Sequence, residues 1–344
     1  MTIANRNDVA KRAKVSGTTV SRVYNSPHLV SPEVREKVLK AAEELNYHPN
    51  KIARNFVKGI SGNVGVIVPY LKGVQRILGQ YFISELLSGI GEALNEDGYD
   101  LVLFFHRQEP TEENDYTRYF VNGKVDGCIF LGAVNNDQGL RRLAETEYKF
   151  CMIENYLEGT DISFIDLDNV KGGYLAVKHL IDLGHRDIAY VNGPLNYTNS
   201  LDRYEGYKKA LQEHALPFRE ELVFQGDFSL NGGRRIAAEL LKMKNPPTAV
   251  FTANDNMAAG LIQGLKDQGI RVPDDIAIVG FDDSDVATSI EPSLTTVRNP
   301  YFELGARCAK EFVKELNQER EKGFKIFLEP ELIIRNSTMA VKSI

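Results

Sequence analysis

Short apolar runs alternate with amphipathic stretches of helical length along most of the chain, from Val64 onward. This alternation is typical of doubly wound α/β layers, in which parallel strands are buried on both faces and covered by helices. The apolar runs that we expect to form strands are VGVIV, DLVLFF, GCIFLG, FCMI, DIAYVNG, AVFT and DIAIVGF. Because the pattern begins again near Asp161, we expect two similar halves.

The first sixty residues carry a different pattern, in which three short helical periods follow one another closely. Asn5 is the expected N-cap of a helix over 6–13, and Asp8 is placed to complete a capping box. Ser16 is the expected cap of a second helix, and Ser31 followed by a proline opens a third. Each helix is too short to be stable alone, so the three must pack together as an all-α headpiece.

The second of these helices carries small polar and cationic side chains opposite its apolar face, namely Thr18, Ser21 and Arg22. The major groove of DNA admits an α-helix, and small residues near the helix start allow close approach while an arginine reaches a base edge or a phosphate. We therefore expect a helix-turn-helix that binds double-stranded DNA through these three residues. The alternative is a three-helix bundle with a solvated polar face.

The charge of the chain is divided unevenly between the headpiece and the rest. The whole chain has a net charge of −6, which by itself disfavours binding to nucleic acid. Residues 1–60, however, hold 11 Lys/Arg and 5 Asp/Glu, a net +6, so the remaining residues carry −12. A basic segment attached to an acidic body is expected when one part meets phosphates and the other faces solvent. The distribution therefore favours DNA binding over the plain bundle.

The headpiece sequence DVAKRAKVSGTTVSRVYNSPHLVSPEVREKVLKAAEELNYHPNKIAR resembles that of the lactose-repressor/galactose-repressor (LacI/GalR) family. The resemblance implies a transcription regulator, and specifically a repressor, that binds a palindromic operator as a homodimer. The chain departs from the family at Gly17, where a side chain usually faces the bases. We therefore expect base contacts to rest on Thr18 and Arg22.

Residues 50–60 follow the headpiece (1–49) as an expected hinge helix, which is marginal in isolation. In the resembled family this segment folds when two subunits lie side by side over the minor groove, and a leucine from each wedges between base pairs. Phe56 occupies that leucine position. We expect Asn50, Arg54 and Phe56 to contact DNA, since an apolar wedge unstacks a base step and bends the duplex. The alternative is that Phe56 packs on the headpiece or the body.

The rest of the chain (61–344) resembles the periplasmic-binding-protein type I fold that the same family uses as its sensor. The resemblance implies one subdomain over about 61–161 and 294–324, and a second over about 162–293 and 325–344. An effector bound between them would change their relative angle and so couple its own binding to that of the operator, reciprocally. Whether the effector acts as an inducer or as a co-repressor is open at this point.

Polar and aromatic side chains follow the expected strands, where ligands bind in sheets of this type. Carboxylates, amides and a guanidinium match vicinal hydroxyls, and an aromatic face packs on the C–H surface of a sugar. We expect a saccharide-type effector site at Tyr70, Glu154, Arg203, Phe228, Asn254 and Asp282. By the family pattern, Asp282 and Asn254 bind hydroxyls, Arg203 holds the ligand and Phe228 stacks on it. Glu154 stands where the family more often has an aspartate.

Other classes of function are less well supported. No G-x-G-x-x-G follows a strand, and no G-x-x-x-x-G-K-[ST], G-x-S-x-G or H-E-x-x-H is present, so we expect neither an enzyme nor a cofactor. The three cysteines lack metal-ligand spacing and are expected to be buried free thiols.

The absence of a signal-peptide pattern and of long apolar runs leads us to expect a cytoplasmic protein without a membrane partner. It also disfavours a sugar-binding transport protein, which would share the fold of the body. A purine-type or phosphoprotein effector stays possible, because Arg203 would bind a carboxylate equally well.

Overall fold

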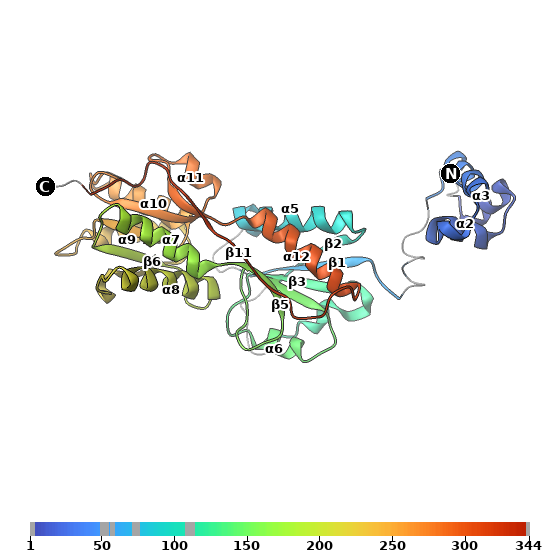
Figure 1. The fold of residues 1–344 in the computed structure, drawn as a ribbon, viewed down its shortest axis with the longest axis horizontal. Helices are drawn as coiled ribbons and strands as arrows, with labels where there is room; N and C mark the ends of the chain where they lie inside the picture. Colours follow the sequence, from blue (N-terminus) through green and yellow to red (C-terminus); the bar gives the residue numbers. More distant parts are fainter. Residues whose placement is uncertain (1–3, 49–54, 56–58, 71–75, 107–113, 342–344) are drawn as a thin grey trace. The chain divides into compact units, whose positions relative to one another are not determined.

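The computed structural model describes residues 4–48, 55, 59–70, 76–106 and 114–341 (Figure 1). The chain divides into two compact units, Met1–Gly62 and Asn63–Ile344, which are described separately.

The first unit contains the three predicted headpiece helices, α1 (Arg6–Ala13), α2 (Gly17–Asn25) and α3 (Pro32–Glu44), with a 3-10 turn at Pro27–Leu29. Their capping residues are the predicted ones, because N-capping depends on side chains that are close in sequence. The Asn5 side chain accepts from the backbone of Asn7 and Asp8, and the Asp8 carboxylate accepts from the Asn5 backbone at 2.8 Å. The apolar faces form one core that includes Val9, Val20 and Val38, all fully buried.

The second unit contains two sheets, each covered by helices. The first sheet is parallel and has the order β11-β5-β4-β3-β1-β2. Its strands are β1 (Asn63–Val68), β2 (Asp100–Phe105), β3 (Gly127–Leu131), β4 (Phe150–Ile153), β5 (Ser163–Leu167) and β11 (Lys325–Leu328). Strands β3, β4 and β5 are buried along their whole length, as expected for apolar runs between two helical layers.

The second sheet has the order β12-β10-β9-β8-β6-β7 and is parallel except for the pair β10–β12. Its strands are β6 (Ile188–Asn192), β7 (Val223–Gln225), β8 (Ala249–Thr252), β9 (Ala277–Asp282), β10 (Thr295–Arg298) and β12 (Glu331–Ile333). We refer to the first sheet with its helices as the first lobe and to the second as the second lobe. Each of the seven strands expected from the sequence is present in one of the two sheets.

The helices of the body differ in which lobe they cover. Those packed on the first sheet are α5 (Tyr81–Glu96), α6 (Gln138–Ala144) and α12 (Tyr301–Leu316). Those packed on the second are α7 (Asn169–Asp182), α8 (Thr198–Glu213), α9 (Leu230–Leu240), α10 (Asp255–Lys266) and α11 (Asp285–Ser289). Short 3-10 turns lie at Ile77–Gly79, Thr117–Tyr119, Val121–Gly123 and Glu220–Leu222.

The chain changes lobe at residues other than those expected. Strand β5 pairs with β4, so the chain stays in the first lobe through Leu167 instead of leaving near 161. Strand β10 pairs with β9, so the return follows Arg298 and not 294. Strand β11 pairs with β5, which moves the last crossing from near 325 to beyond Leu328. The sheet that a short apolar strand joins depends on its distant pairing partner, which the local pattern does not specify.

Helices α5 and α12 lie against each other over the first sheet (Figure 1). A Cβ atom on Gly89 would lie 2.0 Å from the carbonyl oxygen of Phe302, and one on Gly305 would lie 2.4 Å from that of Leu86. Only glycine allows the two backbones to approach this closely. The close packing holds the first residue of α12, Tyr301, in a defined place beside the second lobe.

Candidate functional site

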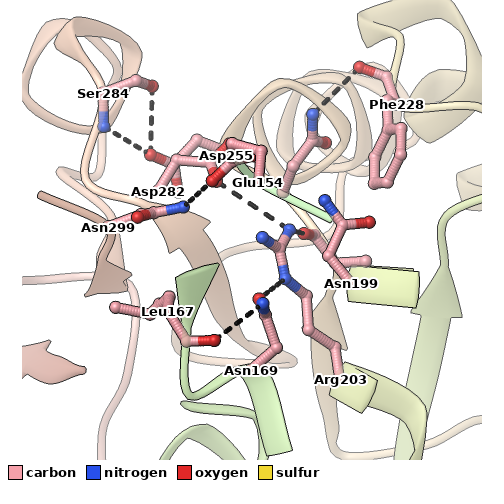
Figure 2. A network of polar contacts seen from close by, with 12 residues as sticks. Glu154, Leu167, Asn169, Asn199, Arg203, Phe228, Asp255, Asp282, Ser284 and Asn299 are labelled. Atoms are coloured by element: carbon pink, nitrogen blue, oxygen red, sulfur yellow. Dashed lines mark hydrogen bonds and ion pairs between the residues drawn. The ribbon is translucent and has the colours of Figure 1, made fainter. Parts of the chain in front are cut away.

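Several predicted site residues meet where the strands of the two lobes end (Figure 2). Glu154 follows β4 of the first lobe, Asp282 ends β9 of the second, and Arg203 lies on α8. Asn254 caps α10, and its side-chain amide donates to the Phe228 carbonyl oxygen at 3.0 Å. The structure therefore brings five of the six predicted residues into one region.

Arg203 is at the centre of this region and is 2% exposed. Its Nε donates to Asn169 Oδ1 at 2.8 Å, and its Nη1 donates to the Ala253 carbonyl oxygen at 2.7 Å. Nη1 also lies 3.9 Å from Asp282 Oδ1, and the guanidinium carbon lies 3.7 Å from the centre of the Phe281 ring. These contacts hold the guanidinium in one orientation, with its Nη2 atom left without a hydrogen-bond partner.

Three of the predicted residues have backbone conformations that side-chain-bearing residues rarely adopt. The φ angle is 75° at Glu154, 62° at Phe228 and 114° at Asp282. Such conformations are unfavourable by about 1–3 kcal/mol each and persist where the surrounding structure determines them, commonly at binding sites. The backbone conformation at these three residues therefore sets the direction of their side chains.

Two residues that the sequence did not single out connect this region to α12. Asn299 Nδ2 donates to Glu154 Oε1 at 2.9 Å, and the Tyr301 hydroxyl donates to Asp282 Oδ1 at 2.7 Å. Both belong to the segment that leads from β10 back to the first lobe. The rule that ligands meet the carboxyl ends of strands would have identified Asn299, had β10 been recognised as a strand of the second sheet.

The region contains more carboxyl groups than cations, and burial governs their ionisation. Burial raises the pKa of Glu154 to about 7 and that of Asp282 to about 6, while the nearby Arg203 opposes both shifts. Burial also raises the pKa of Asp255 to about 8, although Thr296 and Ser284 donate hydrogen bonds to this carboxylate. Ionisation of each of these groups creates a buried charge that its neighbours stabilise less well than water would.

Tyr70, the sixth predicted residue, is linked to this region through Tyr197, whose ring centre lies 6.4 Å from that of Phe228. It borders a cavity of about 30 Å³ at the ends of β1, β2 and β3, together with His106, Tyr116 and Tyr197. The Nδ1 atom of His106 lies 3.2 Å from Nη2 of Arg118, which can only donate, so Nδ1 accepts and the proton of the neutral ring is on Nε2. Burial, with Arg118 nearby, lowers the pKa of His106 and favours this neutral ring. No pattern in the sequence points to His106.

The predicted DNA-contacting residues of the headpiece lie on α2. Thr18 and Arg22 are exposed, and Ser21 is half-buried. Ser16 caps the helix by accepting from the Thr19 backbone at 3.0 Å, which leaves the first turn and its side chains well defined. The predicted hinge residues Asn50, Arg54 and Phe56 lie outside the described residues.

Further features of the described residues bear on other classes of function. None of their helices combines the length and the apolar character needed to span a membrane. They contain no group of three or more His, Cys, Asp and Glu side chains placed to hold a metal ion. The three cysteines are buried free thiols, as predicted.

Comparison with known proteins places these observations in a family. Residues 7–50 match the family described as bacterial regulatory proteins, lacI family, and residues 177–338 match a periplasmic binding protein-like domain. The HTH-type transcriptional regulator DegA of Bacillus subtilis (strain 168) is 34% identical over 334 residues, which cover 96% of this chain and 97% of DegA.

Solved structures that resemble nearly the whole chain include two complexes. A transcriptional regulator CelR–cellobiose complex has 33% identity and a TM-score of 0.75, and the match covers 97% of this chain and 99% of CelR. A lac repressor dimer bound to operator and the anti-inducer ONPF has 28% identity and a TM-score of 0.83, and the match covers 98% and 100% of the two chains.

A helix-turn-helix headpiece joined to a two-lobed ligand-binding body defines a DNA-binding transcription regulator. With relatives of this identity and coverage, the chain belongs to the lacI family of bacterial regulatory proteins.

Proposed function

We propose that the chain is a repressor that binds a palindromic operator as a homodimer and is controlled by a sugar-type effector bound between the two lobes. The observation that carries this proposal is the buried Arg203 beside Asp282, where strand ends of both lobes meet. In this proposal Asp282, Asn254 and Glu154 bind hydroxyls, Arg203 holds the ligand, Phe228 packs on the ring and Tyr70 borders the site.

The similarity to the CelR–cellobiose complex supports a sugar as the effector. The residue types support it as well, because paired carboxylate, amide and guanidinium groups match neighbouring hydroxyls. A purine bound between the lobes is compatible with the same fold, so purines belong in the test below.

The headpiece contacts DNA in this proposal through Thr18, Ser21 and Arg22. The exposure of Thr18 and Arg22 on a well-capped helix supports this assignment. Minor-groove contacts by Asn50, Arg54 and Phe56 stay predictions from the sequence.

A homodimer is supported by the edge of the first sheet. Strand β2 is at the end of the strand order, and Leu103 and Phe105 on it are 36% and 45% exposed. An edge strand with exposed apolar side chains favours association with another copy. The lac repressor of the related structure is a dimer on its operator. We further propose that the protein acts in the cytoplasm and is not an enzyme, since its relatives are regulators.

Selection of duplex sequences by the full chain from a random pool tests the DNA-binding part of the proposal. We expect a palindromic consensus, and selection of no preferred sequence would contradict it. Thermal unfolding of the chain against sugars and nucleobases tests the effector part, because a ligand of the folded state raises the midpoint.

The variant Asp282→Asn should lose the shift caused by the active sugar, whereas Asp267→Asn, which changes an exposed carboxylate paired with Arg234, should keep it. Equal shifts in the two variants would show that the effector binds elsewhere, and a shift with nucleobases only would replace the sugar with a purine.

A further inference from the structure

The face of α2 that carries Thr18, Ser21 and Arg22 begins at a residue without a side chain. Gly17 is the first residue of this helix and precedes Ser21 by four positions, so the two lie on the same face. The N-terminal residues of the second helix in a helix-turn-helix contact base edges. At Gly17, therefore, α2 offers no side chain of its own to the major groove.

The backbone of α2 does not require glycine at this position. Gly17 lies within the helix, and its φ angle is outside the left-handed region that favours glycine. A side chain there would meet α1 instead. A Cβ atom on Gly17 would lie 3.3 Å from Oδ1 of Asn7 and 3.4 Å from Nε of Arg6. The glycine therefore leaves room for two side chains that belong to the other helix.

The start of α1 holds the backbone beneath these two side chains in place. The Asn5 side chain accepts a hydrogen bond from the Asn7 backbone at 2.8 Å, and the Asp8 carboxylate accepts one from the Asn5 backbone at 2.8 Å. Arg6 lies inside this capping box and is exposed. Its guanidinium carbon is 3.8 Å from the place of the missing Cβ on Gly17. The guanidinium is thus seated over the start of α2 and is open to solvent.

A guanidinium in this place has the chemistry needed to recognise guanine. Its planar fork of donors matches O6 and N7 of guanine, which both face the major groove. A contact to a phosphate, by contrast, would be the same for every sequence. Because the guanidinium lies over the face that carries Thr18 and Ser21, a duplex that contacts these residues brings base edges toward it.

Building on the proposed contact between the headpiece and DNA, we propose that Arg6 is a specificity-determining residue. Its guanidinium, seated on Gly17, contacts one guanine in each half-site of the operator. Base recognition is then shared between α1 and α2, and Gly17 provides the seat for Arg6. Substitution of either residue should change the preference at the same base pair.

Selection of duplexes from a random pool by the full chain, followed by titration of the consensus and its single-base variants, tests the role of Arg6. We expect Arg6→Ala to lose the preference for guanine at one position of each half-site, with a roughly tenfold loss of discrimination there. Preferences at the other positions should stay, because α2 is unchanged. Arg22→Ala should lose a preference at a different position.

Lys11→Ala is the matched control for the loss of charge. Lys11 is an exposed cation on α1, five residues after Arg6 and therefore on another face of the helix. Its removal should change the affinity for all duplexes alike, as expected for a charge that acts through phosphates.

The variant Gly17→Ala tests the seat of the guanidinium. The added methyl group should displace the flexible Arg6 side chain and so weaken the same guanine preference. The helix itself should keep its fold, since alanine favours a helix more than glycine does. In a double-mutant cycle, Gly17→Ala should have little further effect at this base pair once Arg6 has been replaced.

An unchanged consensus in Arg6→Ala overturns the inference, and so does a loss of affinity that is equal for every duplex, which would assign Arg6 to a phosphate. Additive effects of Arg6→Ala and Gly17→Ala overturn the seat on Gly17. If the wild-type chain selects no sequence, the proposed operator falls together with the inference. Should Arg6→Ala fail to fold, Arg6→Met keeps an apolar stem over Gly17, lacks the guanidinium and gives the same readout.

Discussion

The Tyr301 hydroxyl, at the start of α12 in the first lobe, donates a hydrogen bond of 2.7 Å to Asp282 Oδ1, at the end of β9 in the second lobe. Tyr301 is buried, and its ring packs edge-on against Tyr81 of α5. Since α5 and α12 are closely packed, the proposed effector-binding residue Asp282 is joined through Tyr301 to this helix pair of the other lobe.

Replacing Tyr301 with phenylalanine should weaken the bridge between the lobes while keeping the ring packing. We expect the free energy of unfolding to fall by about 1–2 kcal/mol, because a buried carboxylate loses its donor. The radius of gyration of the ligand-free protein should increase, as measured by small-angle scattering. Tyr99→Phe is the matched control, since the Tyr99 hydroxyl donates to the exposed Asn317. Identical unfolding and scattering for the two variants would refute the bridge.

Removing the Arg203 side chain should destabilise the protein as well as abolish the effector response. Arg203→Ala leaves Asn169 and a backbone carbonyl without their buried donor and Asp282 without its ion-pair partner, so we expect a loss of about 3–5 kcal/mol in chemical denaturation. Arg234→Ala, which breaks an ion pair about half exposed, should lose less than about 1 kcal/mol. Similar losses in the two variants would mean that Arg203 does not hold the strand ends together.

Local features of the structure could be predicted from the sequence, and long-range pairings could not. Ser16 and Ser31 cap their helices as predicted, because each contacts a backbone group three residues away. The lobe to which β5 belongs was not predictable, since it depends on pairing with β4 and with β11, far along the chain.

The same difference separates the site residues. Asp282 could be placed at the site by the rule for strand ends, and Arg203 by the family resemblance; Arg203 Nη1 and Asp282 Oδ1 lie 3.9 Å apart. The roles of Asn299 and Tyr301 could not be predicted, because their hydrogen bonds require knowing where the chain returns to the first lobe.

The substitution Glu154→Gln should change how stability depends on pH. The pKa of Glu154 is raised by burial from its ordinary 4.5 to about 7, so the folded protein binds this proton more tightly than the unfolded chain. The resulting stabilisation is complete below pH 4.5 and is lost as the pH rises through about 7. The wild type should therefore lose up to about 3 kcal/mol more than Glu154→Gln between pH 5 and pH 8.

Urea unfolding at several pH values measures this difference. Glu205→Gln, which alters an exposed carboxylate on α8, should follow the wild-type curve. Parallel curves for the wild type and Glu154→Gln would mean that Glu154 takes no part in the pH dependence.

The exposed Arg22 on α2 should contribute to operator binding more than the headpiece cations of α3. We expect Arg22→Ala to weaken binding by about 1–3 kcal/mol, and to make the salt dependence less steep by about one unit if its contact is to a phosphate. Lys40→Ala, which removes an equal charge from an exposed position on α3, should have a smaller effect. Titrations of labelled operator at several salt concentrations provide the comparison, and equal effects of the two variants would speak against a specific role for Arg22.

The chain passes between the lobes after Leu167, Arg298 and Leu328, so neither lobe is made from one continuous stretch of residues. A protease that cuts one of these passages leaves the lobes covalently joined through the other two. A gene fragment that ends at any single position cannot encode one complete lobe without part of the other. Expression of one lobe alone would require joining separate segments of the gene, so the two lobes are expected to be inherited and exchanged between proteins as one piece.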